Sequence, residues 1–259
     1  ILASTSMPAI YREKRRAKPV GRPRRRRTTG WLLLLCALAA CTSSARKEEQ
    51  EIKKLLATSA GYLNERGVAE LQGGRYQAAV QYFHQALALT GYDPVLHNNL
   101  GVAFFRLGWL DSAIVSYEAA VRLRPHYFTA YRNLAGAYLA ARNAPLALKA
   151  IDLALQHHED ADHYALRATI HEALEHYEAA VRDYRSALSL APDSANLYNN
   201  LGALYFRLSR LDQAEEQFEL ALQKEPAHAA AAFNLANALA RQCRLEESRR
   251  FYEQALQHA

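Results

Sequence analysis

A short apolar pattern recurs along the chain at a nearly constant interval. The pattern is an alanine, three residues, an aromatic residue or isoleucine, two residues and a second alanine. Its six copies start at Ala79, Ala113, Ala147, Ala180, Ala214 and Ser248, the last with serine in place of the first alanine. Successive copies start 34, 34, 33, 34 and 34 residues apart. Self-similarity at this period predicts a solenoid of stacked repeats, not a domain folded around one central core.

Each copy has an upstream half that is also helical in pattern. The clearest examples are Asn99-Leu100-Gly101 with Phe104 and Asn200-Leu201-Gly202 with Tyr205. Spacings of three and four residues place apolar side chains on one face of a helix. Proline stops a helix, and three of the second halves are followed by one: Pro125, Pro192 and Pro226. The repeating unit is therefore predicted to be two helices joined by a turn.

This two-helix unit resembles the tetratricopeptide repeat, whose period is 34 residues. Six repeats are predicted, over residues 59–93, 94–127, 128–160, 161–194, 195–228 and 229–259. The resemblance implies an all-α, right-handed superhelix with a concave groove lined by the first helix of each repeat. It also implies a protein that binds a protein or an extended peptide in this groove and is not an enzyme.

Three places depart from the regular pattern. Repeat three has Pro145 in its turn and His157-His158-Glu159 near its end, and repeat four has Arg167 where leucine is usual. We expect either a looser stack between these two repeats or a change of register. The last repeat reaches Ala259 without a polar capping helix, which such arrays normally need for solubility. Its apolar end could form a homo-oligomer, bind a partner, or indicate a truncated chain.

The groove-facing residues follow from helix geometry. If His97, Gly101 and Phe104 form the inward stripe of repeat two, residues roughly 160° away face the groove. Two residue types recur in this opposite stripe: Asn99, Asn133, Asn200 and Asn234, then, a turn and a half later, Arg106, Arg207 and Arg241. Repeats one and four interrupt the asparagine series with Glu65 and Leu166.

Asparagine and arginine suit the binding of a peptide. An asparagine side chain has one acceptor and two donors, so it can pair with a peptide backbone of any sequence. The arginines would favour acidic side chains or a terminal carboxylate. The asparagines could equally cap or solvate the starts of their helices, because asparagine is common there.

The chain begins with a basic and then apolar segment. Residues 1–40 carry ten Lys and Arg and one acid, while the other 22 basic residues meet 25 acidic ones. The net charge of +6 thus belongs to this leader, which argues against nucleic-acid binding. The apolar run 31–40 is too short to cross a bilayer, so residues 1–40 are predicted to be a secretory signal peptide.

The end of this segment, Leu38-Ala39-Ala40-Cys41, resembles the lipobox of bacterial lipoproteins. The resemblance implies cleavage before Cys41 and lipidation of its thiol. Residues 41–58 would then be a tether, and the protein would be anchored on the periplasmic face, with the outer membrane favoured. An uncleaved anchor, or a cysteine that follows an ordinary signal peptide by chance, is the alternative.

Chemistry beyond binding finds little support in the sequence. No phosphate loop, nucleophile elbow or Cys/His pairing is present, and no cofactor is expected. The histidines and carboxylates between His157 and His163 match no metal motif. Cys243 lies in a repeat turn and is expected to be a small packing residue.

Three functions are compatible with these observations. The first is a lipid-anchored scaffold that assembles an envelope complex such as a pilus, a secretin or cell-wall machinery. The second is a substrate-recruiting, non-catalytic subunit of a glycosyltransferase or protease. The third is a structural oligomer formed through the last repeat.

Overall fold

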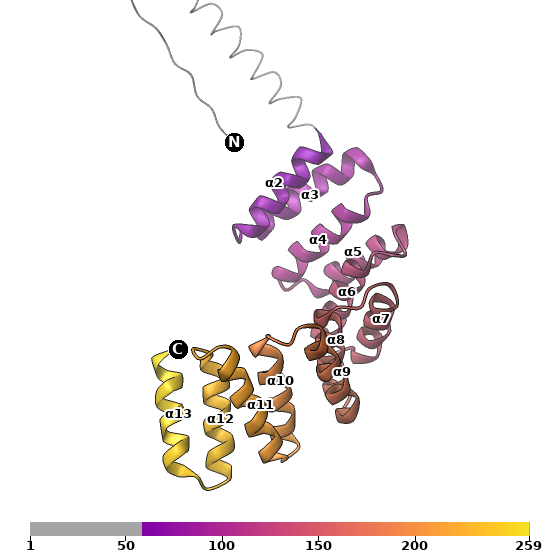
Figure 1. The fold of residues 1–259 in the computed structure, drawn as a ribbon. Coiled ribbons are helices and arrows are strands. Elements are labelled where there is room, and N and C mark those ends of the chain that lie inside the picture. The colour runs from indigo at the N-terminus through magenta and orange to yellow at the C-terminus, as the bar shows by residue number, and fades with distance from the viewer. Residues whose placement is uncertain (1–58, 259) are drawn as a thin grey trace, which may run out of the picture. The chain divides into compact units, whose positions relative to one another are not determined.

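The structure is a computed structural model, and it describes residues 59–258. Within this range the chain forms twelve helices and no strand. They are α2 (Ala60–Gln72), α3 (Tyr76–Thr90), α4 (Pro94–Arg106), α5 (Leu110–Leu123), α6 (Phe128–Ala140), α7 (Ala144–His157), α8 (Ala161–Ala173), α9 (Tyr177–Leu190), α10 (Ala195–Arg207), α11 (Leu211–Lys224), α12 (Ala229–Arg241) and α13 (Leu245–Gln257). Consecutive helices pair into six hairpins, each packed on the next (Figure 1). The all-α solenoid predicted from the sequence is confirmed.

The turn inside every hairpin contains one residue with a left-handed backbone. These residues have φ between 59° and 76° and recur at the repeat interval: Gly74, Gly108, Arg142, Glu175, Ser209 and Cys243. A left-handed conformation costs about 1–2 kcal/mol for a residue other than glycine. The packed helices therefore impose the turn geometry whichever residue occupies it. Cys243 is exposed in this turn, so the expectation that it packs in the interior is wrong.

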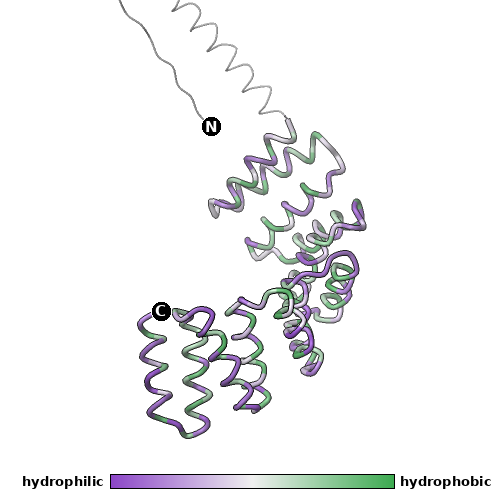
Figure 2. The backbone as a smooth tube through the Cα atoms, in the orientation of Figure 1, coloured by the Kyte–Doolittle hydropathy of each residue, from purple (hydrophilic) through white to green (hydrophobic). Residues whose placement is uncertain are grey.

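Small residues and rings interlock inside the hairpins. A Cβ placed on Gly67, Gly101 or Gly202 would lie 2.5, 2.7 or 2.7 Å from a ring atom of the second helix, in Phe83, Tyr117 and Phe218 respectively. Only glycine lets the two helices approach this closely. Hydrophobic and hydrophilic residues alternate along each helix (Figure 2), as expected for elements that are covered on one side.

The first helices are buried over a wider arc than the sequence predicted. In α4, Leu96, Leu100 and Ala103 are buried against the preceding hairpin. His97 and Phe104, expected in the centre of the inward stripe, are only half-buried. A first helix in a solenoid contacts both its own second helix and that of the preceding repeat, which a single-stripe argument does not anticipate.

The irregular fourth repeat contains a buried ion pair. Arg167 occupies the position of a core leucine, and its guanidinium donates two 2.8 Å hydrogen bonds to the carboxylate of Asp183 and one of 3.0 Å to Asp152. Asp183 is only 6% exposed. These contacts raise the pKa of Arg167, so its guanidinium keeps its positive charge. Arginine is tolerated in the core here because its charge is neutralised locally.

The loosest junction lies after this repeat. Among the first helices of neighbouring repeats, α8 and α10 pack most weakly. The second helix α9 also packs less closely on the following first helix, α10, than the second helices of the other repeats do on theirs. The sequence placed the irregularity between repeats three and four, whereas the structure shows it between repeats four and five.

Candidate functional site

Three of the four asparagines predicted to line the groove are bonded to asparagines of the preceding repeat. Each of the three donates one side-chain N–H to the amide oxygen of its partner, at 2.9 Å: Asn99 to Asn64, Asn133 to Asn98, and Asn234 to Asn199. These bonds fix the first helices side by side. Each asparagine therefore has one polar group engaged in stacking the array.

The acceptors of these bonds were missed by the sequence argument, although a signal for them exists. Asn64, Asn98 and Asn199 precede the predicted series by one position in their repeats. Aligning the repeats would have shown two adjacent asparagine positions instead of one. Asn200 is exposed and makes no hydrogen bond with another described residue, since repeat four has Ala165 where repeats one, two and five have the asparagine acceptor.

The three predicted arginines differ in their contacts. Arg207 forms an ion pair with Glu172 and lies 5.6 Å from the ring centre of Tyr177. Arg241 donates to the Phe206 carbonyl at 3.3 Å and to the Ser209 hydroxyl at 3.2 Å. Arg106 is exposed and makes no such contact with a described residue. It is therefore the arginine most available to a carboxylate on a partner.

A notch in the groove is centred on Gly136. It has a volume of about 350 Å³ and is lined by the first helices α4, α6 and α8, together with Tyr117 of α5. Phe105 and Leu166 contribute apolar walls, and Asn133 lies at its edge. A Cβ built on Gly136 would meet no atom within 4 Å. This glycine is therefore not required by packing, unlike Gly101, and the sequence argument did not identify it.

Polar groups surround the apolar notch. Arg132 and Asp162 line it and form an ion pair at 3.1 Å, with Asp162 largely exposed. The Nδ2 atom of Asn133 is engaged with Asn98, but its Oδ1 atom receives no hydrogen bond from a described residue. A free amide acceptor beside an apolar recess suits a peptide, whose backbone donates while a side chain is buried.

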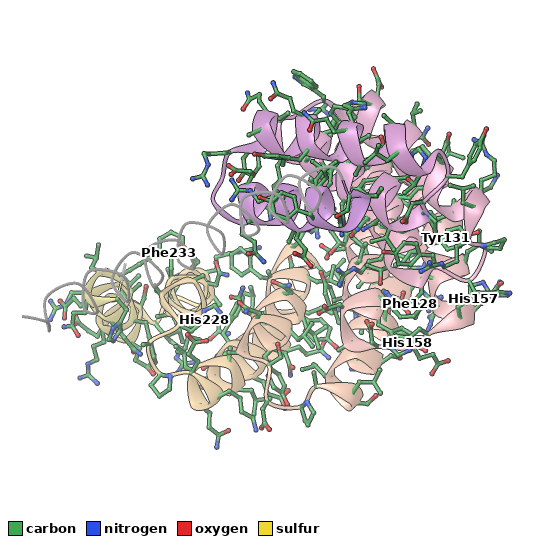
Figure 3. The ribbon with its side chains drawn as sticks, turned by 90° about the horizontal axis from the view of Figure 1, so that it is seen from above. Phe128, Tyr131, His157, His158, His228 and Phe233 are labelled. Carbon is green, nitrogen blue, oxygen red and sulfur yellow. The ribbon has the colours of Figure 1, made fainter. Side chains whose placement is uncertain are left out.

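The histidines of the tract between His157 and His163 pack against neighbouring aromatic rings. The His158 ring stacks on the ring of Phe128, with ring centres 4.6 Å apart (Figure 3). The His157 ring meets that of His126 edge-on, with ring centres 4.7 Å apart. Asp160 caps α8 by accepting from the backbone N–H of His163 at 2.8 Å. Within residues 59–258, no three histidine, cysteine or acidic side chains are grouped to hold a metal ion.

The last described hairpin has an apolar groove of about 510 Å³. It lies between α12 and α13, and Phe233 and Leu256 on its walls are 51% and 78% exposed. This groove belongs to the apolar end that the sequence predicts for the last repeat. That a second copy of the chain or another partner covers it remains a prediction. None of the described helices is long and apolar enough to cross a membrane. The predicted signal peptide and Cys41 lie outside the described residues.

Comparison with known proteins identifies the repeats. A model described as tetratricopeptide repeat matches residues 54–94, 64–127, 98–163 and 204–259, and a second, described as TPR repeat, matches 173–209. The chloroplastic tetratricopeptide repeat domain-containing protein PYG7 of Arabidopsis thaliana is 38% identical over 98 residues, which are 36% of this chain and 33% of the relative. The chain spans less than two thirds of the length of the curated relatives it matches.

Solved structures share the fold. TTC0263, a thermophilic TPR protein of Thermus thermophilus, superposes with a TM-score of 0.59 at 25% identity, over 70% of this chain and 99% of that one. YrrB, described as a TPR protein with an unusual peptide-binding site, has a TM-score of 0.54 at 21% identity, over 68% and 91% of the two chains. The tetratricopeptide repeat model matches more than half of the residues of this chain, so the chain belongs to the tetratricopeptide repeat family.

Proposed function

We propose that this protein is a non-catalytic adaptor that binds an extended peptide along its first helices, with one bulky apolar side chain of the peptide in the notch at Gly136. The observation that carries this proposal is the absence of a side chain at Gly136, which opens an apolar recess that packing does not require. The tetratricopeptide fold is suited to holding proteins or peptides, and YrrB supplies a precedent at the level of the fold.

The groove offers both parts of a peptide-binding site. Phe105 and Leu166 can cover an apolar side chain, whose transfer from water provides affinity. The free oxygen of Asn133 can accept a backbone N–H from the same peptide, and exposed Arg106 can pair with an acidic group farther along. Arg207 and Arg241 would reach a peptide only by giving up their present contacts.

Filling the notch is expected to weaken binding strongly without damaging the fold. Peptides selected on the wild-type chain from a random phage-displayed library should bind Gly136→Leu about tenfold more weakly or worse, a loss of about 1.4 kcal/mol or more. Gly136→Leu should be at least as stable as the wild type, because glycine costs about 1 kcal/mol inside a helix. Calorimetric titration and urea unfolding measure the two effects.

Gly61→Leu is the matched control. Gly61 lies in the first turn of α2, and a Cβ there also meets no atom within 4 Å. This variant should retain full peptide affinity. Equal affinity of the peptides for Gly136→Leu and the wild type would show that they bind elsewhere, and failure to select any peptide would contradict the proposed function.

We further propose that the repeats act at a membrane, held there by a lipid on Cys41. The support is the sequence of the leader: four arginines at 24–27, the apolar run 31–40 and the cysteine directly after it. In this proposal the adaptor serves the assembly of an envelope complex on the periplasmic side. Two or three acyl chains would anchor it firmly, whereas a single chain binds only weakly.

Cys41→Ser tests the anchor. The wild-type chain, expressed in a bacterium with two membranes, should be found in the membrane fraction and should incorporate a labelled fatty acid. The variant should lose the label and be recovered in the soluble fraction, while Cys243→Ser should behave as the wild type. Retention of Cys41→Ser in the membrane with its label intact would refute lipidation at this residue.

A further inference from the structure

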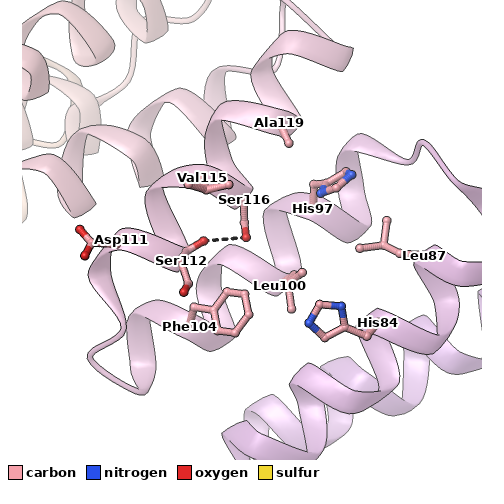
Figure 4. A pocket seen from close by; sticks show the side chains of 10 residues that line it. All are labelled: His84, Leu87, His97, Leu100, Phe104, Asp111, Ser112, Val115, Ser116 and Ala119. Carbon is pink, nitrogen blue, oxygen red and sulfur yellow. Dashed lines mark hydrogen bonds between the residues drawn. The ribbon is translucent and has the colours of Figure 1, made fainter.

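A second pocket lies on the face of the second helices, opposite the groove. It has a volume of about 500 Å³ and is formed by α3, α4 and α5 (Figure 4). His84, His97 and Phe104 point into it from α3 and α4, and Ser112 and Ala119 form the wall on α5. The edge of the His84 ring meets Phe104, with ring centres 6.1 Å apart.

Repeat three fills the equivalent space with its own side chains. At the position of His97, repeats three, four and five carry Tyr131, Tyr164 and Tyr198, and each of these tyrosines packs against a core cluster. At the positions of Ser112 and Ala119, repeat three carries Leu146 and Leu153. The pocket is open in repeat two because its residues at these three positions are smaller than Tyr131, Leu146 and Leu153 of repeat three.

Repeat two also lacks a tyrosine hydroxyl that repeats three and five have at the equivalent position. At the position of Phe104, repeat three has Tyr138, whose hydroxyl donates to Glu118 at 2.6 Å, and repeat five has Tyr205, whose hydroxyl accepts from Arg185 at 2.8 Å. Glu118 and Arg185 stand at the position of His84. Phe104 has no hydroxyl, and His84 makes no hydrogen bond with another described residue. Burial lowers the pKa of His97, so its ring is neutral and has a free acceptor nitrogen at pH 7.

The rim of the pocket is unusually apolar for a solvent-facing surface. Val115 lines the pocket and is 65% exposed. The other five repeats have only polar or charged residues at this position: Gln81, Lys149, Arg182, Glu216 and Arg250. Trp109 is next to the pocket: its ring stacks on that of Phe104, with ring centres 5.8 Å apart, and it is 52% exposed. An apolar rim around a pocket favours a protein surface as the occupant, because a small ligand would leave Val115 and Trp109 in water.

We infer that this outer pocket is a docking site for an aromatic side chain, best a tyrosine, presented by a partner protein. The ring would occupy the volume that Tyr131, Leu146 and Leu153 fill in the next repeat. Its hydroxyl would reach the imidazoles of His84 and His97 and the Ser112 hydroxyl. This site is separate from the notch in the groove, because the two surfaces share only the helix α4 and use different residues of it: the pocket uses His97, Leu100 and Phe104, and the notch uses Phe105.

The probes for this site are p-cresol, which is the isolated tyrosine side chain, toluene and N-acetyl-tyrosinamide. The full chain, with isotope-labelled histidine, is titrated with each while the ring signals of His84 and His97 are followed by NMR. Saturable shifts of both rings are expected with p-cresol, with half-saturation on the order of 1 mM, and weaker binding of toluene. N-acetyl-tyrosinamide should bind at least as well as p-cresol, because the pocket opens to the surface.

Two variants close the pocket with residues that this chain already uses in repeat three. The variants are His97→Tyr and Ala119→Leu, and in the first of them binding is followed by the ring signals of His84 alone. Each variant should weaken p-cresol binding by about tenfold or more without lowering the melting temperature. Ser186→Leu, at the position of Ala119 in repeat four, is the matched control and should leave the shifts unchanged.

Shifts that do not saturate, or that persist in both filled variants, would overturn the site. Binding of p-cresol but not of N-acetyl-tyrosinamide would overturn the assignment to a protein side chain and favour a small ligand. Concentration-dependent self-association that Ala119→Leu abolishes would identify a second copy of this chain as the occupant and overturn the assignment to a separate partner. None of these outcomes depends on peptide binding in the groove.

Discussion

Replacement of Phe218 by alanine is expected to lower the free energy of unfolding by about 3–5 kcal/mol, the usual cost of removing a buried aromatic ring. Phe218 is 1% exposed, and its ring lies directly against Gly202. The cavity cannot close easily, because the helices on either side are held apart by other contacts in the same core cluster. Urea unfolding followed by circular dichroism measures the loss.

The damage should be local, because each repeat of a solenoid contacts only its neighbours. Hydrogen exchange is expected to quicken first in α10 to α13, while α2 to α7 keep their protection. Phe105→Ala is the matched control: this phenylalanine is 37% exposed in the groove, and its loss should cost much less. A uniform loss of protection along the described helices would contradict nearest-neighbour stability.

Removing the positive charge from the core of repeat four should have an effect of similar size. Arg167→Met would leave the carboxylate of Asp183 buried without its guanidinium partner. Breaking a buried ion pair costs about 3–5 kcal/mol, and we expect a value near the lower end, since the Arg167 side chain is 25% exposed. The measurement is again urea unfolding.

The double variant Arg167→Leu with Asp183→Ala provides the comparison. It restores the residues that repeat three has at these positions, Leu134 and Ala150. Replacing a buried pair by apolar residues is often neutral or stabilising, so the double variant should be at least as stable as the wild type. If Arg167→Met and the double variant were equally unstable, the ion pair would not be the cause.

The fold was predictable because its information is periodic. The pattern that starts at Ala79 repeats at one interval, and each copy requires the same two helices, so an error at one position is corrected by the others. The irregular fourth repeat was recognised as such, but its cause was not. The residues that neutralise Arg167 lie 15 and 16 positions away in two different helices, where no local pattern connects them.

The candidate site was less predictable because it depends on differences between repeats. Helix geometry placed Asn133 in the groove, but the bond from Asn133 to Asn98 spans 35 residues and depends on how neighbouring repeats are stacked. The notch at Gly136 depends on an empty volume, which a sequence does not display. A glycine in mid-helix was the available signal, since it costs stability and therefore calls for a reason.

Adjacent residues of α4 line the two faces of this array. Phe104 lines the outer pocket, whereas Phe105 lines the notch in the groove. A ligand that shifts or stiffens α4 from one side must therefore change the free energy of binding on the other. Such coupling is reciprocal: the factor by which an outer partner alters the affinity for a groove peptide equals the factor by which the peptide alters the affinity for that partner. A single helix would then make the second repeat a thermodynamic link between two binding partners that never touch.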